Sequence, residues 1–161
     1  MAVYTKISSK DIHLTNSKFD IDEIKSFQGI KKGIENTNYL LKTKNEKFIL
    51  TIFEKRVSNK EIPFFMKLMD NLNQSNISCP KPLKDKNGNY LIKLKKKTGC
   101  IVSFLKGKDK KTLNNTNCYQ VGKIISQIHL ITKNFNFFRK NSLSPKNLSS
   151  LLKSIKFKSK N

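Results

Sequence analysis

Residues Gly29 to Arg56 read Gly-Ile-Lys-Lys-Gly-Ile-Glu-Asn-Thr-Asn-Tyr-Leu-Leu-Lys-Thr-Lys-Asn-Glu-Lys-Phe-Ile-Leu-Thr-Ile-Phe-Glu-Lys-Arg, and this stretch decides the fold. Two runs rich in apolar residues, Asn38–Thr43 and Phe48–Phe53, are separated by a short polar turn. A further strand is predicted over Phe27–Glu35, and the small polar loop Glu35–Asn38 joins it to the other two. The pattern therefore predicts an antiparallel meander of three strands.

Helical and extended patterns alternate on both sides of this meander. Apolar spacing predicts three helices, over Ser9–Phe19, Ser58–Asn73 and Thr116–Thr132, with Ser9 and Ser58 as the caps of the first two. A fourth, short helix is predicted from Ser144-Pro145 to Ile155. The dipeptide Asn87-Gly88 favours a hairpin between Leu83 and Tyr90, and two more strands are predicted over 90–94 and 100–105.

This order of elements predicts an α+β fold. We expect a five-stranded antiparallel sheet with a helix packed on it over residues 1–105. A polar linker and one or two helices of an incomplete helical lobe follow over residues 106–161. The Thr116–Thr132 helix carries an apolar side for which the rest of the chain offers little cover.

The 161 residues carry a formal net charge of +22, and Arg56 and Arg139 are the only arginines among 33 basic residues. Weak, salt-sensitive attraction of polyanions is expected at this charge. However, Lys, Asn and Ile are encoded by AT-rich codons, and a dedicated nucleic-acid reader uses more arginine.

The cysteines Cys79, Cys100 and Cys118 have no motif partners, so neither a zinc site nor a disulfide framework is expected. We find no membrane-spanning run and no secretory signal, so we expect a cytoplasmic protein without a membrane partner.

Short segments recur in a defined order along the chain: Met1-Ala-Val-Tyr-Thr-Lys6, Phe27-Gln-Gly-Ile30, Gly33-Ile-Glu-Asn-Thr-Asn-Tyr-Leu-Leu41, Phe48-Ile-Leu-Thr-Ile-Phe-Glu-Lys-Arg-Val57, Pro63-Phe-Phe65, Cys79-Pro-Lys-Pro82, Ile101-Val-Ser-Phe-Leu-Lys-Gly107 and Gly122-Lys-Ile-Ile-Ser-Gln-Ile-His129. Together they resemble the N-terminal portion of the bacterial homoserine kinases of the aminoglycoside-phosphotransferase type. The resemblance implies a two-lobed, kinase-like fold. It also implies phosphorylation of the side-chain hydroxyl of L-homoserine with ATP and Mg²⁺, in threonine biosynthesis.

The resemblance also assigns roles to residues. The phosphates would be covered by Gly33, Glu35, Asn36, Thr37 and Asn38, and the hinge strand, whose backbone pairs with adenine, would be Ser103, Phe104 and Leu105. Ile49 and Val102 are candidates for the apolar adenine slot, with core packing as the alternative. Thr51 stands where many kinases carry a phosphate-gripping lysine, and Lys55 lies nearby at the strand end.

No Asp or Glu follows Asp109 in the sequence. A kinase needs carboxylates to hold Mg²⁺ and to orient the attacking hydroxyl. We therefore expect no catalytic and no metal-binding residues in this chain, which would then be the N-terminal portion of such an enzyme. A second chain carrying the missing half could restore activity. Two other hypotheses stay open: a small basic protein that binds nucleic acid or another polyanion, and a non-functional remnant.

Overall fold

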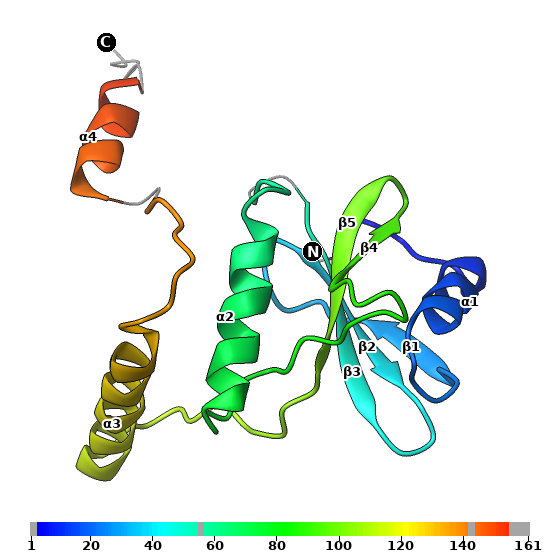
Figure 1. Ribbon diagram of the computed structural model, residues 1–161, viewed down its shortest axis with the longest axis horizontal. Helices are drawn as coiled ribbons and strands as arrows, with labels where there is room; N and C mark the ends of the chain where they lie inside the picture. The colour runs from blue at the N-terminus through cyan, green and yellow to red at the C-terminus, as the bar shows by residue number, and fades with distance from the viewer. Residues whose placement is uncertain (1–2, 55–56, 142–143, 155–161) are drawn as a thin grey trace.

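The computed structural model of the chain describes residues 3–54, 57–141 and 144–154, and Figure 1 shows the arrangement of its elements. In chain order the elements are α1 (Ser9–Lys18), β1 (Ser26–Gly29), β2 (Thr37–Lys42), β3 (Lys47–Ile52), α2 (Ile62–Gln74), β4 (Leu91–Leu94), β5 (Lys97–Ser103), α3 (Asn115–Thr132) and α4 (Pro145–Ser154). The strands form one sheet in the order β1-β2-β3-β5-β4, and all of its pairs are antiparallel. The predicted α+β fold is confirmed.

One face of the sheet, here called the outer face, is closed. Along β2 and β3 every second side chain is buried, and Leu41, Leu50 and Ile52 are fully buried. The helix α1 covers this face with Ile12, and the residue after it adds Phe19. Each such side chain contributes about 1.5–3 kcal/mol on burial, so this layer holds the sheet together.

The opposite, inner face carries α2, which lies on the other side of the sheet from α1 (Figure 1). Its buried side chains Ile62 and Met66 pack with Cys100 of β5. The helix begins at Ile62 with Glu61 as its N-cap, so the prediction that Ser58 caps it is wrong. Ser58 instead closes a separate turn, because its carbonyl accepts the Glu61 N–H at 2.9 Å and the Glu61 carboxylate accepts the Ser58 N–H at 3.3 Å.

Two other element boundaries also differ from the predictions. The helix α1 is capped by Ser8 rather than Ser9, because the Asp11 carboxylate accepts both the backbone N–H and the hydroxyl of Ser8 at 2.7 Å. The strand predicted to run to Glu35 ends at Gly29. The residues between β1 and β2 therefore form a longer loop than the sequence indicated.

The hairpin of the sheet lies elsewhere than predicted. Gly88 does occupy a turn, with φ of 80° and its N–H bound to the Asp85 carbonyl at 2.9 Å. The segment before it is not a strand, since it meets β5 only through a single bridge at Pro82. The true hairpin joins β4 to β5 through Lys95 and Lys96, which both have positive φ, at 49° and 63°.

The helical part of the chain follows the sheet after a linker. The helix α3 begins at Asn115, one residue before its predicted start, and Asn114 caps it by accepting the Asn117 N–H at 2.9 Å. The helices α3 and α4 lie beyond α2, on its far side from the sheet (Figure 1). The predicted end of the last helix, Ile155, lies outside the described residues, as do Lys55 and Arg56.

The helix α3 buries none of its side chains. Its large apolar side chains are exposed, including Tyr119, Val121, Ile124, Ile125 and Leu130. The expectation that this helix lacks cover is therefore met within the described part of the chain. None of the described helices is both long and apolar enough to cross a membrane.

Candidate functional site

The site predicted from sequence falls on the inner face of the sheet. Side chains of β2 and β3 that do not point to the closed outer face, such as Leu40 and Ile49, are only half-buried. The helix α2 covers this face beside β5, through contacts that include Val102 and Leu91. The part of the inner face formed by β2 and β3 is thus less covered than the outer face of the same strands.

An apolar row crosses three strands on this face. Leu40 lies opposite Ile49 in the β2–β3 pair, and Ile49 lies opposite Val102 in the β3–β5 pair. All three side chains are half-buried. A flat, partly open apolar surface of this kind suits a planar heteroaromatic ring, because such a ring gains by removing apolar area from water.

The hinge residues follow directly from this row, at the end of β5. The Ser103 N–H donates to the Lys81 carbonyl at 2.9 Å, and the Phe104 N–H donates to the Lys47 carbonyl at 3.1 Å. The Leu105 N–H has no partner among the described residues. The hinge therefore offers one backbone donor next to the apolar row, and the Phe104 and Leu105 side chains are exposed around it.

A polar row runs parallel to the apolar one, two residues further from the hinge. The Thr51 hydroxyl donates to the Asn38 side-chain oxygen at 2.8 Å, and Thr51 lies opposite Cys100 of β5. The structure thus brings together two of the predicted site residues, Asn38 and Thr51. Neither carries a charge, so this row can orient a polar group but cannot neutralise one.

The loop before β2 lies at the other end of the strands from the hinge. Thr37 is paired with Ile52, whereas Ser103 is paired with Phe48, four positions away along β3. At about 3.3 Å per residue this separation is roughly 13 Å. Gly33 in this loop has φ of 118°, a conformation that glycine adopts at little cost.

The side chains of the loop do not all face the same way. Thr37 is fully buried on the outer face, opposite to the side on which Asn38 and Thr51 lie. The Asn36 side-chain oxygen accepts the Glu54 N–H at 3.4 Å. Glu35 also has an interaction within the protein. Any contact of this loop with phosphate would therefore come chiefly from its backbone.

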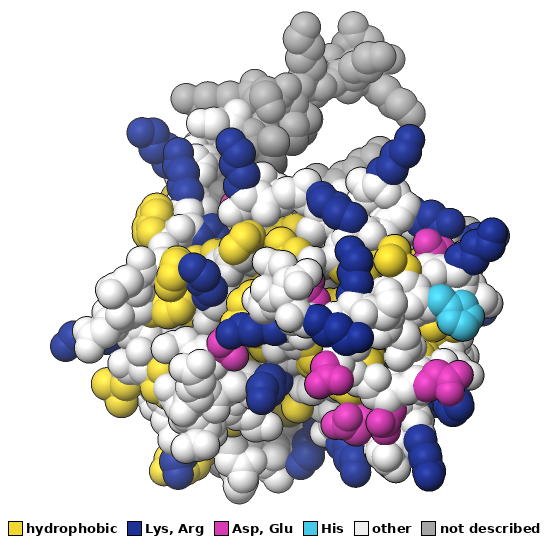
Figure 2. Space-filling model, turned by 45° about the vertical axis from the view of Figure 1, so that its right-hand side comes forward, with side chains coloured by type: hydrophobic (Ala, Val, Ile, Leu, Met, Phe, Trp, Pro, Cys, Tyr) yellow, Lys and Arg dark blue, Asp and Glu magenta, His cyan; other side chains and the backbone are white. Residues whose placement is uncertain are grey.

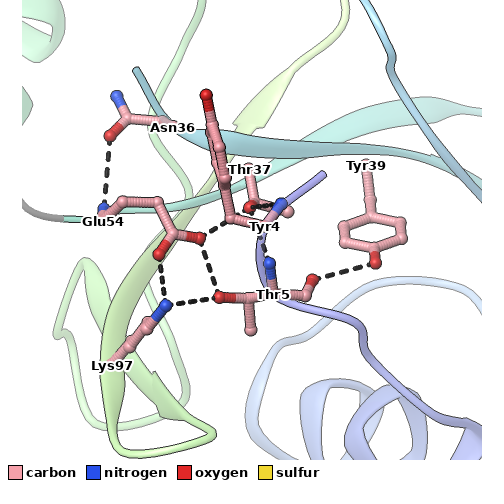
Figure 3. A network of polar contacts seen from close by, with 7 residues as sticks. All are labelled: Tyr4, Thr5, Asn36, Thr37, Tyr39, Glu54 and Lys97. Carbon is pink, nitrogen blue, oxygen red and sulfur yellow. Dashed lines mark hydrogen bonds and ion pairs between the residues drawn. The ribbon is translucent and has the colours of Figure 1, made fainter. Parts of the chain in front are cut away.

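A polar network that the sequence did not reveal holds Thr37 in place (Figure 3). The Glu54 carboxylate accepts hydrogen bonds from the hydroxyls of Thr37 at 2.6 Å and Thr5 at 2.7 Å, and it forms an ion pair with Lys97. Partial burial raises the pKa of Glu54, but the Lys97 ammonium and the two hydroxyls outweigh it and hold this pKa below its ordinary value. No local pattern could have indicated the network, because its members are 17 to 92 residues apart.

The charged side chains of the described residues do not gather into a cation site. No group of three or more His, Cys, Asp or Glu side chains in the described ranges could hold a metal ion. Asp109, the last acidic residue, is exposed and paired with Lys32. The described residues therefore do not fit Mg²⁺. Basic side chains are spread over the face seen in Figure 2 rather than gathered in one patch.

These features define a class of protein. A five-stranded antiparallel sheet with one helix on its inner face, followed by a linker and helices, is the N-terminal lobe of a kinase-like phosphotransferase. The chain belongs to the phosphotransferase enzyme family, whose model matches residues 26–153.

Relatives and solved structures agree with this assignment. The chain is 39% identical over 144 residues to the homoserine kinase of Bartonella tribocorum, covering 89% of this chain and 45% of that protein. It is 38% identical over 156 residues to the homoserine kinase of Paramagnetospirillum magneticum, covering 97% of this chain and 48% of that protein. The chain thus spans about half the length of these curated relatives.

The fold comparison gives spectinomycin phosphotransferase in complex with ADP and spectinomycin, with a TM-score of 0.65 at 18% identity, covering 88% of this chain and 44% of that one. The AMP-bound complex of spectinomycin phosphotransferase matches with a TM-score of 0.61.

Proposed function

We propose that this chain is the nucleotide-binding lobe of an ATP-dependent phosphotransferase that acts on the side-chain hydroxyl of L-homoserine. The half-buried row of Leu40, Ile49 and Val102, ending at the Leu105 N–H, is the observation that carries the nucleotide part of this proposal. In this arrangement adenine lies against the row and accepts a hydrogen bond from Leu105. The phosphates extend along β2 and β3 toward the loop at Gly33.

The names of the relatives support the substrate, and the solved structures with ADP and AMP support the nucleotide. Together these lines favour homoserine kinase activity in threonine biosynthesis, in the cytoplasm, for the protein of which this lobe is a part. The boundary between the nucleotide-binding lobe and the helical part falls, in this proposal, between residues 105 and 106.

Phosphoryl transfer needs more than this lobe supplies. Positioning and charge neutralisation provide most of the catalysis of such reactions, and the described residues offer no set of carboxylates for Mg²⁺. We therefore expect turnover only when a polypeptide equivalent to the other half of the relatives is present. The exposed apolar side of α3 is a surface against which that half could pack.

Titration with adenosine tests the nucleotide-binding part of the proposal without any contribution from the high positive charge of the chain. Adenosine is uncharged, so it binds the apolar row and the hinge but gains nothing from the lysines. We expect the 161-residue chain to bind ATP and adenosine, and adenosine to compete with ATP. If inorganic tripolyphosphate binds as tightly as ATP, and adenosine does not compete with ATP, the chain is instead a polyanion-binding protein.

The variant Ile49→Phe sharpens the test. A larger side chain in the centre of the half-buried row occupies the place of adenine, so we expect at least about a tenfold loss of adenosine affinity, or about 1.4 kcal/mol. Ile124→Phe on the exposed side of α3 is the matched control. Unchanged affinity in Ile49→Phe, with thermal unfolding like that of the parent, would refute the proposed slot.

A chimera tests the activity. The 161 residues replace the matching portion of the Paramagnetospirillum magneticum homoserine kinase, of which they cover 48%. We expect ATP consumption that depends on L-homoserine. A folded chimera that binds ATP but consumes none with L-homoserine, while the unaltered relative does, would contradict the proposed activity of this lobe.

A further inference from the structure

The N-terminal segment before α1 touches the loop before β2 at two points. The Tyr4 hydroxyl donates to the Ile34 carbonyl at 3.0 Å, within the loop. The backbone N–H groups of Tyr4 and Thr5 donate to the Thr37 hydroxyl oxygen at 2.9 and 3.0 Å, where the loop enters β2. A segment 30 to 33 residues away in sequence thus fixes the loop at two points.

The hydrogen-bonding capacity of Thr37 is fully used by these contacts. A hydroxyl has one donor and two acceptor positions. The Thr37 hydroxyl accepts the N–H groups of Tyr4 and Thr5 and donates to the Glu54 carboxylate at 2.6 Å. It has no position left for a phosphate oxygen, and its side chain is fully buried.

Glu54 joins the loop to the rest of the sheet. Its carboxylate binds Thr37 and Thr5 and pairs with Lys97 at the start of β5, while its backbone N–H donates to the Asn36 side chain. Its side chain is only 9% exposed, so these contacts are well shielded from water. The same residue therefore fixes two successive positions at the end of the loop.

The conformation of Gly33 makes restraint of this loop by its neighbours important. Gly33 has φ of 118° and no atom within 4 Å of the place where a Cβ would lie. Glycine at such a position is free to adopt other conformations. A loop that binds phosphates through its backbone N–H groups gains affinity when those groups are already in place.

We propose that the N-terminal segment and Glu54 form a clamp that sets the shape of the phosphate loop, with Tyr4 and Glu54 as positioning residues and Thr37 as the point where they meet. This inference rests on the proposed function, since it assigns the loop to phosphates. The clamp acts on the loop and leaves the adenine slot, on the inner face by the hinge, untouched. Its loss therefore weakens ATP binding and spares adenosine binding.

The variants Tyr4→Phe and Glu54→Gln test the clamp in the full 161-residue chain. Tyr4 is 56% exposed, so removing its hydroxyl leaves the fold intact and deletes only the bond to Ile34. Tyr119→Phe and Glu23→Gln are matched controls, at an exposed tyrosine of α3 and at an exposed glutamate paired with Lys25. Two measurements are made on each: amide hydrogen exchange over residues 31–36, and the affinities for ATP and adenosine.

We expect faster exchange over 31–36 in both test variants and an ATP affinity that falls about fivefold, while adenosine affinity stays unchanged. Exchange rates equal to those of the controls would overturn the clamp. Equal losses for ATP and adenosine would overturn the positioning role, because general destabilisation affects both ligands. A parent chain that binds neither ligand refutes the proposed function, and in that case the exchange data alone decide whether the clamp exists.

Discussion

We predict that Arg139→Ala lowers the free energy of unfolding by about 1–2 kcal/mol. The Arg139 guanidinium lies 5.1 Å from the centre of the Phe65 ring, and its Nε lies 3.0 Å from the Glu61 carboxylate. The N–H does not align with the oxygen, so this second contact is an ion pair and not a hydrogen bond. The side chain of Arg139 is 25% exposed and that of Glu61 is 32% exposed.

The partial exposure of these two side chains determines how large the loss of stability is. A cation–π contact at such a site contributes about 0.5–1 kcal/mol, and an ion pair that water partly screens contributes about 0.2–1 kcal/mol. The stacked arginine stem adds a smaller packing contribution. The expected loss is therefore well below that of a core substitution, yet above the range of about ±0.5 kcal/mol that is typical of surface changes.

Urea denaturation followed by circular dichroism measures the loss, with Lys140→Ala as the exposed neighbouring control. Combination with Glu61→Ala in a double-mutant cycle isolates the ion pair, for which we expect a coupling of about 0.5 kcal/mol. A change in Arg139→Ala no larger than that in Lys140→Ala would refute the reasoning. It would mean that the segment after α3 does not bind α2 in solution.

Three further predictions concern the sheet. Leu50→Ala, at a fully buried position, is expected to cost about 2–5 kcal/mol in urea denaturation, and a loss below about 1 kcal/mol would contradict the assigned core. Partial burial raises the pKa of Glu54, but the Lys97 ammonium and the hydroxyls of Thr37 and Thr5 outweigh this and hold the pKa below the ordinary 4.5. The stabilising contribution of Glu54 is therefore complete above that pH and is lost as the pH falls through the lower, folded-state pKa. Urea midpoints should accordingly fall more steeply from about pH 5 to about pH 3 in the parent than in Glu54→Gln, and parallel curves would exclude this role. Burial raises the pKa of Cys100 to about 12, so a thiol reagent at about pH 8 should label exposed Cys118 and spare Cys100, and rapid labelling of both would show that α2 does not cover β5.

The sequence allowed prediction of the features that depend on local periodicity. The alternation of apolar residues around Leu41 and Leu50 predicted two strands with one buried face, because the side-chain period of a strand is two. The β4–β5 turn could not be predicted in this way. Lysine has no preference for positive φ, and the conformation of Lys95 and Lys96 follows from pairing of the flanking strands, with Leu94 opposite Lys97.

The candidate site was predictable where the chain resembles a known family. That resemblance named Ile49 and Val102 for the apolar slot, and the register does bring them opposite each other. The position of Thr37 was different. Its orientation depends on Tyr4 and Thr5, which are 33 and 32 residues away, and on Glu54, which the strand pattern ended before reaching. Distant partners of this kind leave no trace in a local pattern.

Two apolar surfaces remain partly open in the structure, and their dimensions call for different ligands. The row from Leu40 to Val102 is three residues wide, and at about 4.8 Å between strands it spans roughly 10 Å, which a single heteroaromatic ring system can cover. The apolar side of α3, with exposed Val121, Ile124 and Ile125, runs from Val121 to Ile131, about 15 Å at 1.5 Å per residue, on a convex helix that no small molecule could cover. Only another polypeptide can remove such a stripe from water. If the chimera with the homoserine kinase remainder folds as proposed, amides of α3 should therefore gain protection from hydrogen exchange relative to the 161-residue chain, whereas the row at Ile49 should gain protection only when nucleotide is added.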